Sequence, residues 1–350
     1  MGSRAAGLAP VPESDLSWCH DVVRDVSRTF AISIDVLDEP TSSYVCVGYL
    51  VCRIADTIED TARLAPSVTV SLLDRYDRVF DPADEVDVDA FEAAVEPHLP
   101  AERSADWSVV ADAGRVLRTV ERLPTDVRAA IVPPTRELVE GMATFVDRHA
   151  DHGGIRIRSV SELEAYCYYV AGTVGHLLTN LFVRDVDDEA VVERLEGTAT
   201  GFGQLLQLVN VAKDVHVDYT EENSVYLPAD WLDEVGVPQE AVLARDHRAA
   251  VASVVARTAE HARSSLDDAH AYLDALARVD RNAFAAFAVP FLLAVGTLRE
   301  LSDRPGDALA PGGVTVSRDE VEAIVAAVTT DAGPESLAAL RASVRRGTLH

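Results

Sequence analysis

The chain has 350 residues, and 48% of them are hydrophobic, which is enough for a large buried core. Its net charge is −27, from 58 Asp and Glu against 31 Lys and Arg, and its only lysine is Lys213. This acidity argues against a nucleic-acid partner, because phosphate binding requires a basic surface, and against adsorption to anionic lipid. It is also typical of a halophilic protein, in which salt screens the repulsion between surface acids.

The four cysteines show neither the spacing of a zinc site nor a disulfide framework, so we expect free, buried thiols in a reducing compartment. Residues 1–12 lack the apolar core of a signal peptide. The longest uncharged run, 282–298, is shorter than the ~20 residues of a membrane span and contains Pro290. We therefore expect a cytoplasmic protein without a transmembrane anchor, and peripheral membrane contact stays open.

Apolar residues at helical spacing predict an all-α protein with one core and no linker that divides it. We expect the helix that follows Pro40 to be capped by Thr41 or Ser42, and Ser161 to open a capping box. The prolines at 133–134 and Pro290 are expected to break helices. We expect a flexible segment over 1–15, a helical core over 16–302, and a loop with a short helical tail over 303–350. The predicted helices are 18–34, 44–62, 109–123, 138–146, 163–182, 191–217, 242–276, 284–301, 321–328 and 337–344.

Two pairs of aspartates, Asp56 with Asp60 and Asp214 with Asp218, share one spacing, and each follows a mostly apolar stretch. Residues four apart on a helix lie on one face, with Cβ atoms roughly 5–6 Å apart, so each pair presents two carboxylates side by side. In so acidic a chain, such a pair also arises by chance on a solvated face. Buried stripes rarely carry charges without partners, however, and two facing pairs would suit Mg²⁺ and a diphosphate.

Other polar residues accompany each pair. Arg53 precedes Asp56 by three residues and shares its face, either as an ion-pair partner or as a ligand of diphosphate. Gln207 and Asn210 share one helical stripe with the second aspartate pair, between apolar neighbours, which indicates the polar wall of a cavity. Two further strings are less specific. Residues 27–30 are also compatible with an ordinary helix that carries an exposed arginine. The tyrosines of 166–175 are also compatible with ordinary residues of the hydrophobic core.

Taken in order, the strings 27–30, 49–60, 166–175 and 207–218 resemble the squalene/phytoene synthase family of head-to-head prenyl transferases. The resemblance runs from about Trp18 to Leu301. It implies a single-domain, isoprenoid-synthase-type helical bundle with a central cavity, in which 16–302 is the catalytic domain.

The resemblance also implies roles for individual residues. The ligands of Mg²⁺, or of Mn²⁺ in its place, would be Asp56, Asp60, Asp214 and Asp218. The catalytic residues would be Tyr49, Arg53 and Tyr166. Substrate and diphosphate would be bound by Ser27, Arg28, Phe30, Arg53, Gln207, Asn210, Lys213, Val170, Ala171 and Gly172. Lys213 stands where an arginine is common in the family, and it keeps the charge without the bidentate fork.

The implied activity is that of a squalene synthase, which joins two farnesyl diphosphates to presqualene diphosphate and reduces this to squalene with NADPH. The stretch 287–298 is similar to squalene synthases. The stretch 224–228 is more similar to phytoene synthases, which join two geranylgeranyl diphosphates without NADPH. A non-catalytic assembly factor of the family is a distant alternative. Such members tend to lose the aspartates, whereas this chain keeps all four. A terpene cyclase would not explain the string 166–175.

Overall fold

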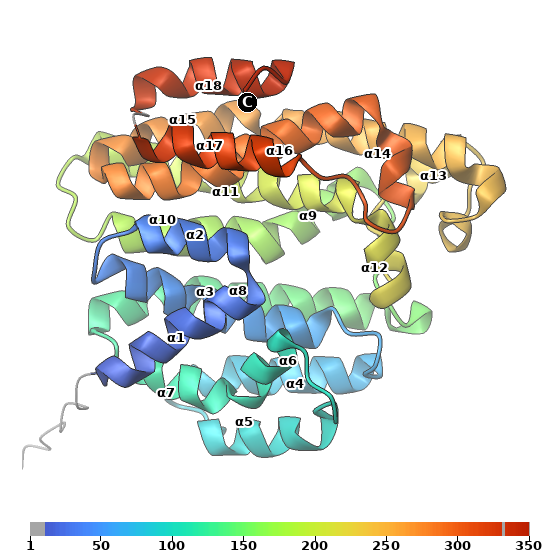
Figure 1. The fold of residues 1–350 in the computed structure, drawn as a ribbon. Coiled ribbons are helices and arrows are strands. Elements are labelled where there is room, and N and C mark those ends of the chain that lie inside the picture. Colours follow the sequence, from blue (N-terminus) through green and yellow to red (C-terminus); the bar gives the residue numbers. More distant parts are fainter. Residues whose placement is uncertain (1–10, 331–332, 350) are drawn as a thin grey trace, which may run out of the picture.

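The computed structural model describes residues 11–330 and 333–349, apart from the side chains of residues 28, 29 and 334. Over these residues the chain is helical, as predicted, and the one β contact is an isolated bridge between Arg156 and Val225. The first half of the chain forms α1 (Glu13–Val26), α2 (Arg28–Val36), α3 (Thr41–Glu59), α4 (Pro66–Val79), α5 (Val88–Val95), η1 (Glu96–His98), α6 (Ala105–Ala111), α7 (Ala113–Arg122), α8 (Thr125–Arg148), η2 (Ala150–His152), α9 (Val160–Cys167), the π-helical η3 (Tyr168–Gly172) and α10 (Thr173–Phe182) (Figure 1).

The second half of the chain is built in the same way. It forms α11 (Glu189–Lys213), α12 (Val215–Glu221), α13 (Ala229–Glu234), η4 (Gln239–Ala241), η5 (Arg245–His247), α14 (Arg248–Arg263), α15 (Leu266–Val279), α16 (Arg281–Asp303), η6 (Pro305–Leu309), α17 (Arg318–Thr330) and α18 (Pro334–Arg346).

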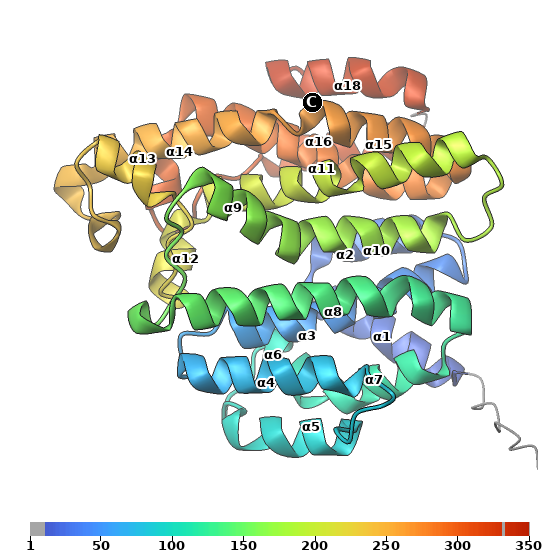
Figure 2. The same ribbon diagram turned by 180° about the vertical axis from the view of Figure 1, so that it is seen from behind.

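Most helices run side by side in stacked layers, with the N-terminal half on one side and the C-terminal half on the other (Figures 1 and 2). The helix α10 contacts both α8 and α11, and α3 contacts α4, α8 and α10. On its other side, α11 packs against α14, α15 and α16. The short α12 crosses between the two halves at one end of the bundle (Figure 2). The C-terminal ends of α3 and α11 therefore face the same interior space.

Glycines bring α11 into direct backbone contact with η3 and α10. A Cβ on Gly203 would lie 2.1 Å from the carbonyl oxygen of Ala171, and one on Gly175 would lie 2.3 Å from that of Ala199. No side chain fits at either position. The small residues of the string 166–175 thus serve close helix packing. The segment Gly201-Phe202-Gly203 lies within α11 and is no dinucleotide-binding turn.

Prolines lie inside two helices where the sequence predicted breaks, so that prediction is wrong. Pro133 and Pro134 lie within α8, and Pro290 lies within α16. A proline leaves the carbonyl four residues earlier without its usual partner. For Pro134 this carbonyl belongs to Ala130, and it accepts a hydrogen bond from Asn180 Nδ2 at 3.3 Å. At Pro134 a contact from α10 therefore replaces the bond that the proline removes.

Helix starts also differ from the prediction. The helix α3 begins after Pro40 without a side-chain cap. Ser159 rather than Ser161 caps α9, because its hydroxyl accepts from the backbone N–H of Glu162 at 3.3 Å. The predicted helix 18–34 is divided at Ser27, whose hydroxyl caps α2. The predicted helix 242–276 is likewise divided into α14 and α15.

The C-terminal helices pack onto α16. Arg299 of α16 donates to both carboxylate oxygens of Glu320 at 2.7 Å, and to the backbone carbonyl of Val344 at 2.6 Å. By length and composition α16 could cross a membrane, but 78% of its most apolar window is buried inside the protein. It therefore serves as a core helix of this bundle. The four cysteines are buried and free, as predicted.

Candidate functional site

Two groups of carboxylates, called walls here, line the site. The first wall consists of Asp56 and Asp60, where α3 ends. Asp56 is in the last turn, and Asp60 follows the helix and donates its backbone N–H to the carbonyl of Asp56 at 2.8 Å. This bond keeps the helical spacing, so both carboxylates share one face. Burial raises the pKa of Asp56 to about 6, although Arg53 acts to lower it. Asp60 also stands at the negative end of the helix dipole, where a carboxylate is disfavoured unless a cation is near.

The second wall consists of Asp214 and Asp218, where α11 ends and α12 begins. Asp214 interrupts the helix predicted over 191–217, yet hydrogen bonds of helical type continue on both sides of it. Its N–H donates to Asn210 at 2.9 Å, and its carbonyl accepts from Asp218 at 3.0 Å. Gln207, Asn210 and the two aspartates therefore stay on one stripe, as predicted. Asp214 repeats the position of Asp60, because it directly follows the last residue of a helix.

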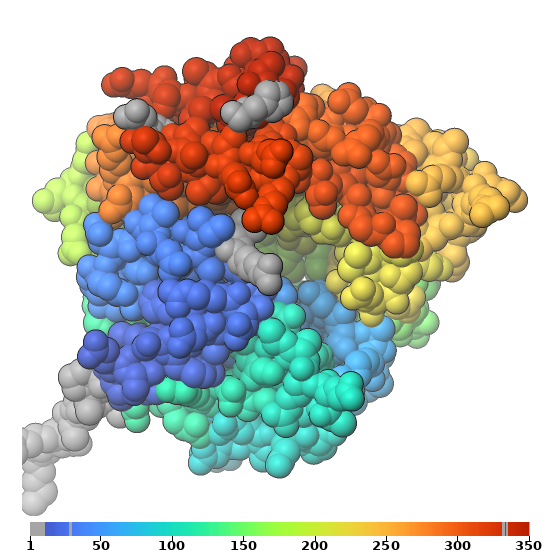
Figure 3. All heavy atoms as spheres, viewed as in Figure 1, coloured from blue at the N-terminus to red at the C-terminus, as the bar shows by residue number. Residues whose placement is uncertain are grey.

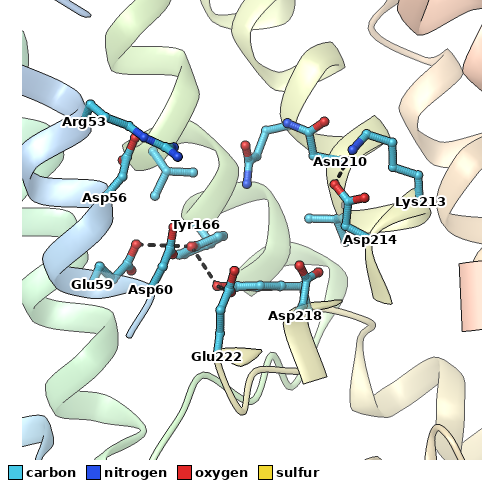
Figure 4. A pocket seen from close by; sticks show the side chains of 14 residues that line it. Arg53, Asp56, Glu59, Asp60, Tyr166, Asn210, Lys213, Asp214, Asp218 and Glu222 are labelled. Carbon is cyan, nitrogen blue, oxygen red and sulfur yellow. Dashed lines mark hydrogen bonds and ion pairs between the residues drawn. The ribbon is translucent and has the colours of Figure 1, made fainter. Parts of the chain in front are cut away.

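The two walls face each other across one cavity of about 340 Å³ (Figure 4). The space-filling view shows the surface hollowed between the N-terminal helices and α12 (Figure 3). All four predicted metal-ligand aspartates line the cavity, together with six of the twelve other predicted site residues. The predicted residues along it are Arg53, Asp56, Asp60, Tyr166, Val170, Gln207, Asn210, Lys213, Asp214 and Asp218.

Four cavity residues were not predicted as site residues: Glu59, Val211, Glu222 and Tyr226. Glu59 lies between the two aspartates of the first wall, and Glu222 follows Asp218 by four residues, so the acidic spacing continues there. Tyr226 follows Glu222 by four residues in turn. The four-residue spacing, continued in the sequence beyond Asp214 and Asp218, would have predicted both Glu222 and Tyr226.

The carboxylates crowd one another inside the protein. Burial, reinforced by Asp214, raises the pKa of Asp218 to about 8. Burial and the charge of Asp218 raise the pKa of Glu222 to about 9. Burial and neighbouring acids hold the pKa values of Glu59 and Asp60 well above their ordinary range. Such a cluster is unfavourable without cations, which neutralise the repulsion.

The donor set fits Mg²⁺ shared with a substrate. One carboxylate oxygen of Glu59, Oε1, is buried without a hydrogen-bond partner. Among the described residues, no three Asp, Glu, His or Cys side chains converge closely enough to hold an ion by themselves. Magnesium in proteins is usually bound by one or two carboxylates, waters and substrate phosphates, rather than by an all-protein cage. Two facing walls of carboxylates match that mode of binding.

Two cationic side chains face the same cavity. Arg53 pairs with Asp106 of α6, with Nη2 2.7 Å from the carboxylate, instead of with the aspartates of its own helix. Lys213 pairs with the neighbouring Asp214. Both side chains are partly exposed and line the cavity, so both could meet a phosphate.

A second, more apolar cavity of about 730 Å³ adjoins the first and shares Asn210, Lys213 and Asp214 with it. The structure places Ser27, Phe30 and Tyr49 here instead of in the carboxylate cavity. Tyr49 stacks on Phe30, with ring centroids 4.4 Å apart. Other lining residues come from α11, α16 and the loop before α17, among them Leu206, Val209, Pro290, Leu293, Ala294, Gly313, Val314 and Val316.

Two predicted substrate-binding residues, Ala171 and Gly172, line neither cavity. The backbone of Ala171 packs against Gly203, and Gly172 lies between Tyr168 and Thr200. Of the string 166–175, the structure thus brings Tyr166 and Val170 into the carboxylate cavity. The backbone of Arg28 opens α2, but its side chain lies outside the described part of the chain.

The fold and the site define a class of all-α proteins, in which a helical bundle encloses two facing carboxylate walls. A sequence model of the family described as "Squalene/phytoene synthase" matches residues 23–320. The chain belongs to this family.

Individual relatives agree with the family. The squalene synthase ERG9 of Candida albicans is 27% identical over 303 residues, which cover 85% of this chain and 64% of that protein. The squalene synthase of Bos taurus is 26% identical over 310 residues, which cover 85% of this chain and 67% of that protein. The chain thus spans about two thirds of the length of these relatives.

Solved structures share the fold. TcSQS in complex with a ligand matches with a TM-score of 0.77 at 22% identity, over 96% of this chain and 99% of the other. A dehydrosqualene synthase in complex with a ligand matches with a TM-score of 0.59 at 18% identity, over 91% of this chain and 96% of the other. These likenesses confirm the predicted all-α isoprenoid-synthase architecture.

Proposed function

We propose that the chain is a Mg²⁺-dependent prenyltransferase that condenses two farnesyl diphosphates head to head and yields squalene, with presqualene diphosphate as the intermediate. The observation that carries the proposal is the juxtaposition of two cavities. One presents carboxylates from two walls and two cations, and the adjoining one is larger and mostly apolar. A prenyl diphosphate has the same two parts, a charged head and a hydrocarbon chain.

The residues of the first cavity would hold the charged head. Asp56, Asp60, Asp214 and Asp218 would bind Mg²⁺, with Asn210 beside them, and the bound ion would absorb negative charge on the leaving diphosphate. Arg53 and Lys213 would add positive charge at the phosphates. The C–O bond of one substrate breaks, and its electron pair leaves with the diphosphate.

The apolar cavity would hold the carbon chains and exclude water, which would otherwise quench the carbocation. The double bond of the second chain attacks the cationic carbon, and a proton is lost as the cyclopropane ring of presqualene diphosphate closes. In this proposal Tyr166 lies at the carboxylate cavity, and Tyr49 lies beside the carbon chains. Both tyrosines would thus be near the reacting carbons, but in adjoining cavities.

The Gly-x-Gly of α11 forms no dinucleotide turn, because it lies within a helix, where Gly203 packs against η3 and Gly201 faces Asp268. We therefore assign no residue to NADPH. NADPH is part of the proposal because the proposed product, squalene, requires a reductant. The product assay tests this requirement.

The assay incubates the purified chain, at high salt and with Mg²⁺, with farnesyl or geranylgeranyl diphosphate, each with and without NADPH. We expect squalene from farnesyl diphosphate with NADPH, and presqualene diphosphate when NADPH is omitted. Phytoene from geranylgeranyl diphosphate as the main product would contradict the proposed substrate. A folded protein that consumes neither substrate would contradict the enzymatic proposal and favour a non-catalytic role.

A further inference from the structure

Two buried tyrosines lie against each other at the carboxylate cavity. The rings of Tyr166, from α9, and Tyr226, from the segment after α12, are stacked with centroids 4.9 Å apart and planes 24° apart. Their hydroxyl oxygens are 3.1 Å apart and hydrogen-bonded. Only 2% of Tyr166 and 6% of Tyr226 is exposed to solvent. Each ring therefore restricts the plane of the other, and the hydroxyl contact fixes where both oxygens lie.

Each tyrosine is also linked to one carboxylate wall. The hydroxyl of Tyr166 is 3.4 Å from Oε2 of Glu59, which lies between the two aspartates of the first wall. The hydroxyl of Tyr226 is 3.4 Å from Oε2 of Glu222, which follows the second wall. The order Glu59, Tyr166, Tyr226, Glu222 thus bridges the two walls by side chains alone. Figure 4 labels Glu59, Tyr166 and Glu222 of this series.

We infer that Tyr226, anchored by Glu222, is a positioning residue for Tyr166. The inference rests on the proposed function, in which Tyr166 is the tyrosine at the diphosphate-binding cavity. Tyr166 has no other hydroxyl or amide partner among the described residues, so its oxygen is placed by Glu59 and Tyr226 alone. Glu59 lies at the longer distance, 3.4 Å against 3.1 Å for Tyr226. The stacked Tyr226 is the rigid partner, and it holds Tyr166 in place before substrate binds.

The first test is Tyr226→Phe in the full chain, assayed with farnesyl diphosphate and Mg²⁺. Phenylalanine keeps the stacked ring and removes only the hydroxyl. We expect kcat to fall about 10- to 100-fold, because small misplacement of a catalytic group costs up to roughly 100-fold, while KM changes less than about threefold. Glu222→Gln keeps an oxygen acceptor for Tyr226 and should cause a smaller loss of kcat than Glu222→Leu.

Tyr272→Phe is the matched control. Tyr272 is also buried and stacked, on Phe202 at 4.9 Å, and its hydroxyl is also hydrogen-bonded, to Thr179 at 3.1 Å, but it lines neither cavity. It should keep kcat within about twofold of the wild type, since it only removes a distant hydrogen bond. Melting curves of all variants check folding, and Glu222→Gln replaces Tyr226→Phe if the latter does not fold.

The decisive readout is a double-mutant cycle with Tyr166→Phe. If Tyr226 acts through Tyr166, adding Tyr226→Phe to Tyr166→Phe should lower kcat no further, within about twofold. Losses that multiply in the double variant, or a single Tyr226→Phe with wild-type kcat, would overturn the inference. A wild-type chain without turnover would overturn the proposed function itself, which makes the two failures distinguishable.

Discussion

Asp60 and Asp214 occupy equivalent places, each directly after the last residue of a long helix. The backbone carbonyls at a helix C-terminus carry partial negative charge, which favours Lys or Arg there and disfavours Asp by roughly 0.3–1 kcal/mol. Other helices of this chain also end directly before an aspartate, as α6 does at Asp112 and α15 at Asp280, but only Asp60 and Asp214 of these four line the carboxylate cavity. The arrangement is favourable once a cation binds between them, which is why we read these two residues as parts of a metal and diphosphate site.

Glu162 lies at the start of the helix that carries Tyr166, and it provides a prediction on stability. Burial acts to raise the pKa of its carboxyl, but hydrogen bonds from Arg158 and Arg148 lower it from 4.5 to about 2. A lowered pKa contributes stability that is complete above the unfolded value and is lost as pH falls towards 2. Glu162→Gln should therefore lower the free energy of unfolding at pH 7 by about 2–3 kcal/mol.

Denaturant unfolding of both proteins at several pH values measures this difference. The gap between wild type and Glu162→Gln should be widest at neutral pH and shrink as pH falls from 4.5 towards 2, because the carboxylate becomes protonated. A gap that is independent of pH would show that the charge of Glu162 has no part in holding α9.

The sequence predicted those site residues that are related by the spacing of a single helix. The spacing of Asp56 with Asp60, and of Gln207 with Asn210, reveals a shared face without knowledge of the fold. The pairing of Arg53 with Asp106, and of Tyr166 with Tyr226, joins elements far apart in sequence. Such contacts depend on how helices pack, so no local spacing reports them.

At the scale of elements, the contact between α11 and η3 sets where the second wall lies relative to Tyr166. The sequence showed small residues in 166–175 but could not show which helix they would meet. It also could not show that Asn180 would satisfy the carbonyl freed by Pro134. Helix ends next to prolines were therefore predicted wrongly, whereas the all-α class, which follows from hydrophobic periodicity, was predicted correctly.

Two glycines of α11 test this contact. Gly203→Ala would place a Cβ 2.1 Å from the carbonyl oxygen of Ala171, so the helices must separate, and we expect about 1–3 kcal/mol of destabilisation. Gly197→Ala, in the same helix, has nothing within 4 Å and is exposed. It should stabilise the protein by about 0.5–1 kcal/mol, because alanine favours helix more than glycine.

Chemical denaturation measures both variants under one condition. Opposite signs for Gly203→Ala and Gly197→Ala support the close approach of the two backbones. Equal effects of the two substitutions would mean that α11 does not touch η3 at Gly203.

At the scale of the whole molecule, the net charge of −27 dominates. Surface acids repel one another over about 10 Å at 0.1 M salt and over about 3 Å at 1 M. We propose that the protein is adapted to high salt, and we expect its melting temperature to rise by several degrees between roughly 0.1 M and 2 M KCl. Differential scanning calorimetry measures this. The rise should become small at acidic pH, where the carboxylates are neutral, and a melting temperature unchanged by KCl at neutral pH would refute the adaptation.

The family, the fold and the two adjoining cavities all indicate one site that is built by both halves of the chain. Helices from both halves of the chain end at one interior space, and each brings carboxylates to it. Neither half contains a complete site, so the activity should depend on both walls together. This dependence is the central claim, and it can be tested without knowledge of the final product.

The most direct test measures diphosphate release from farnesyl diphosphate by the wild type, Asp56→Asn and Asp214→Asn, each with Mg²⁺ and with EDTA. We predict Mg²⁺-dependent release by the wild type, and a loss of at least about 100-fold in either variant with unchanged far-ultraviolet circular dichroism. Release at the wild-type rate by either variant would contradict the account, because one wall would then suffice.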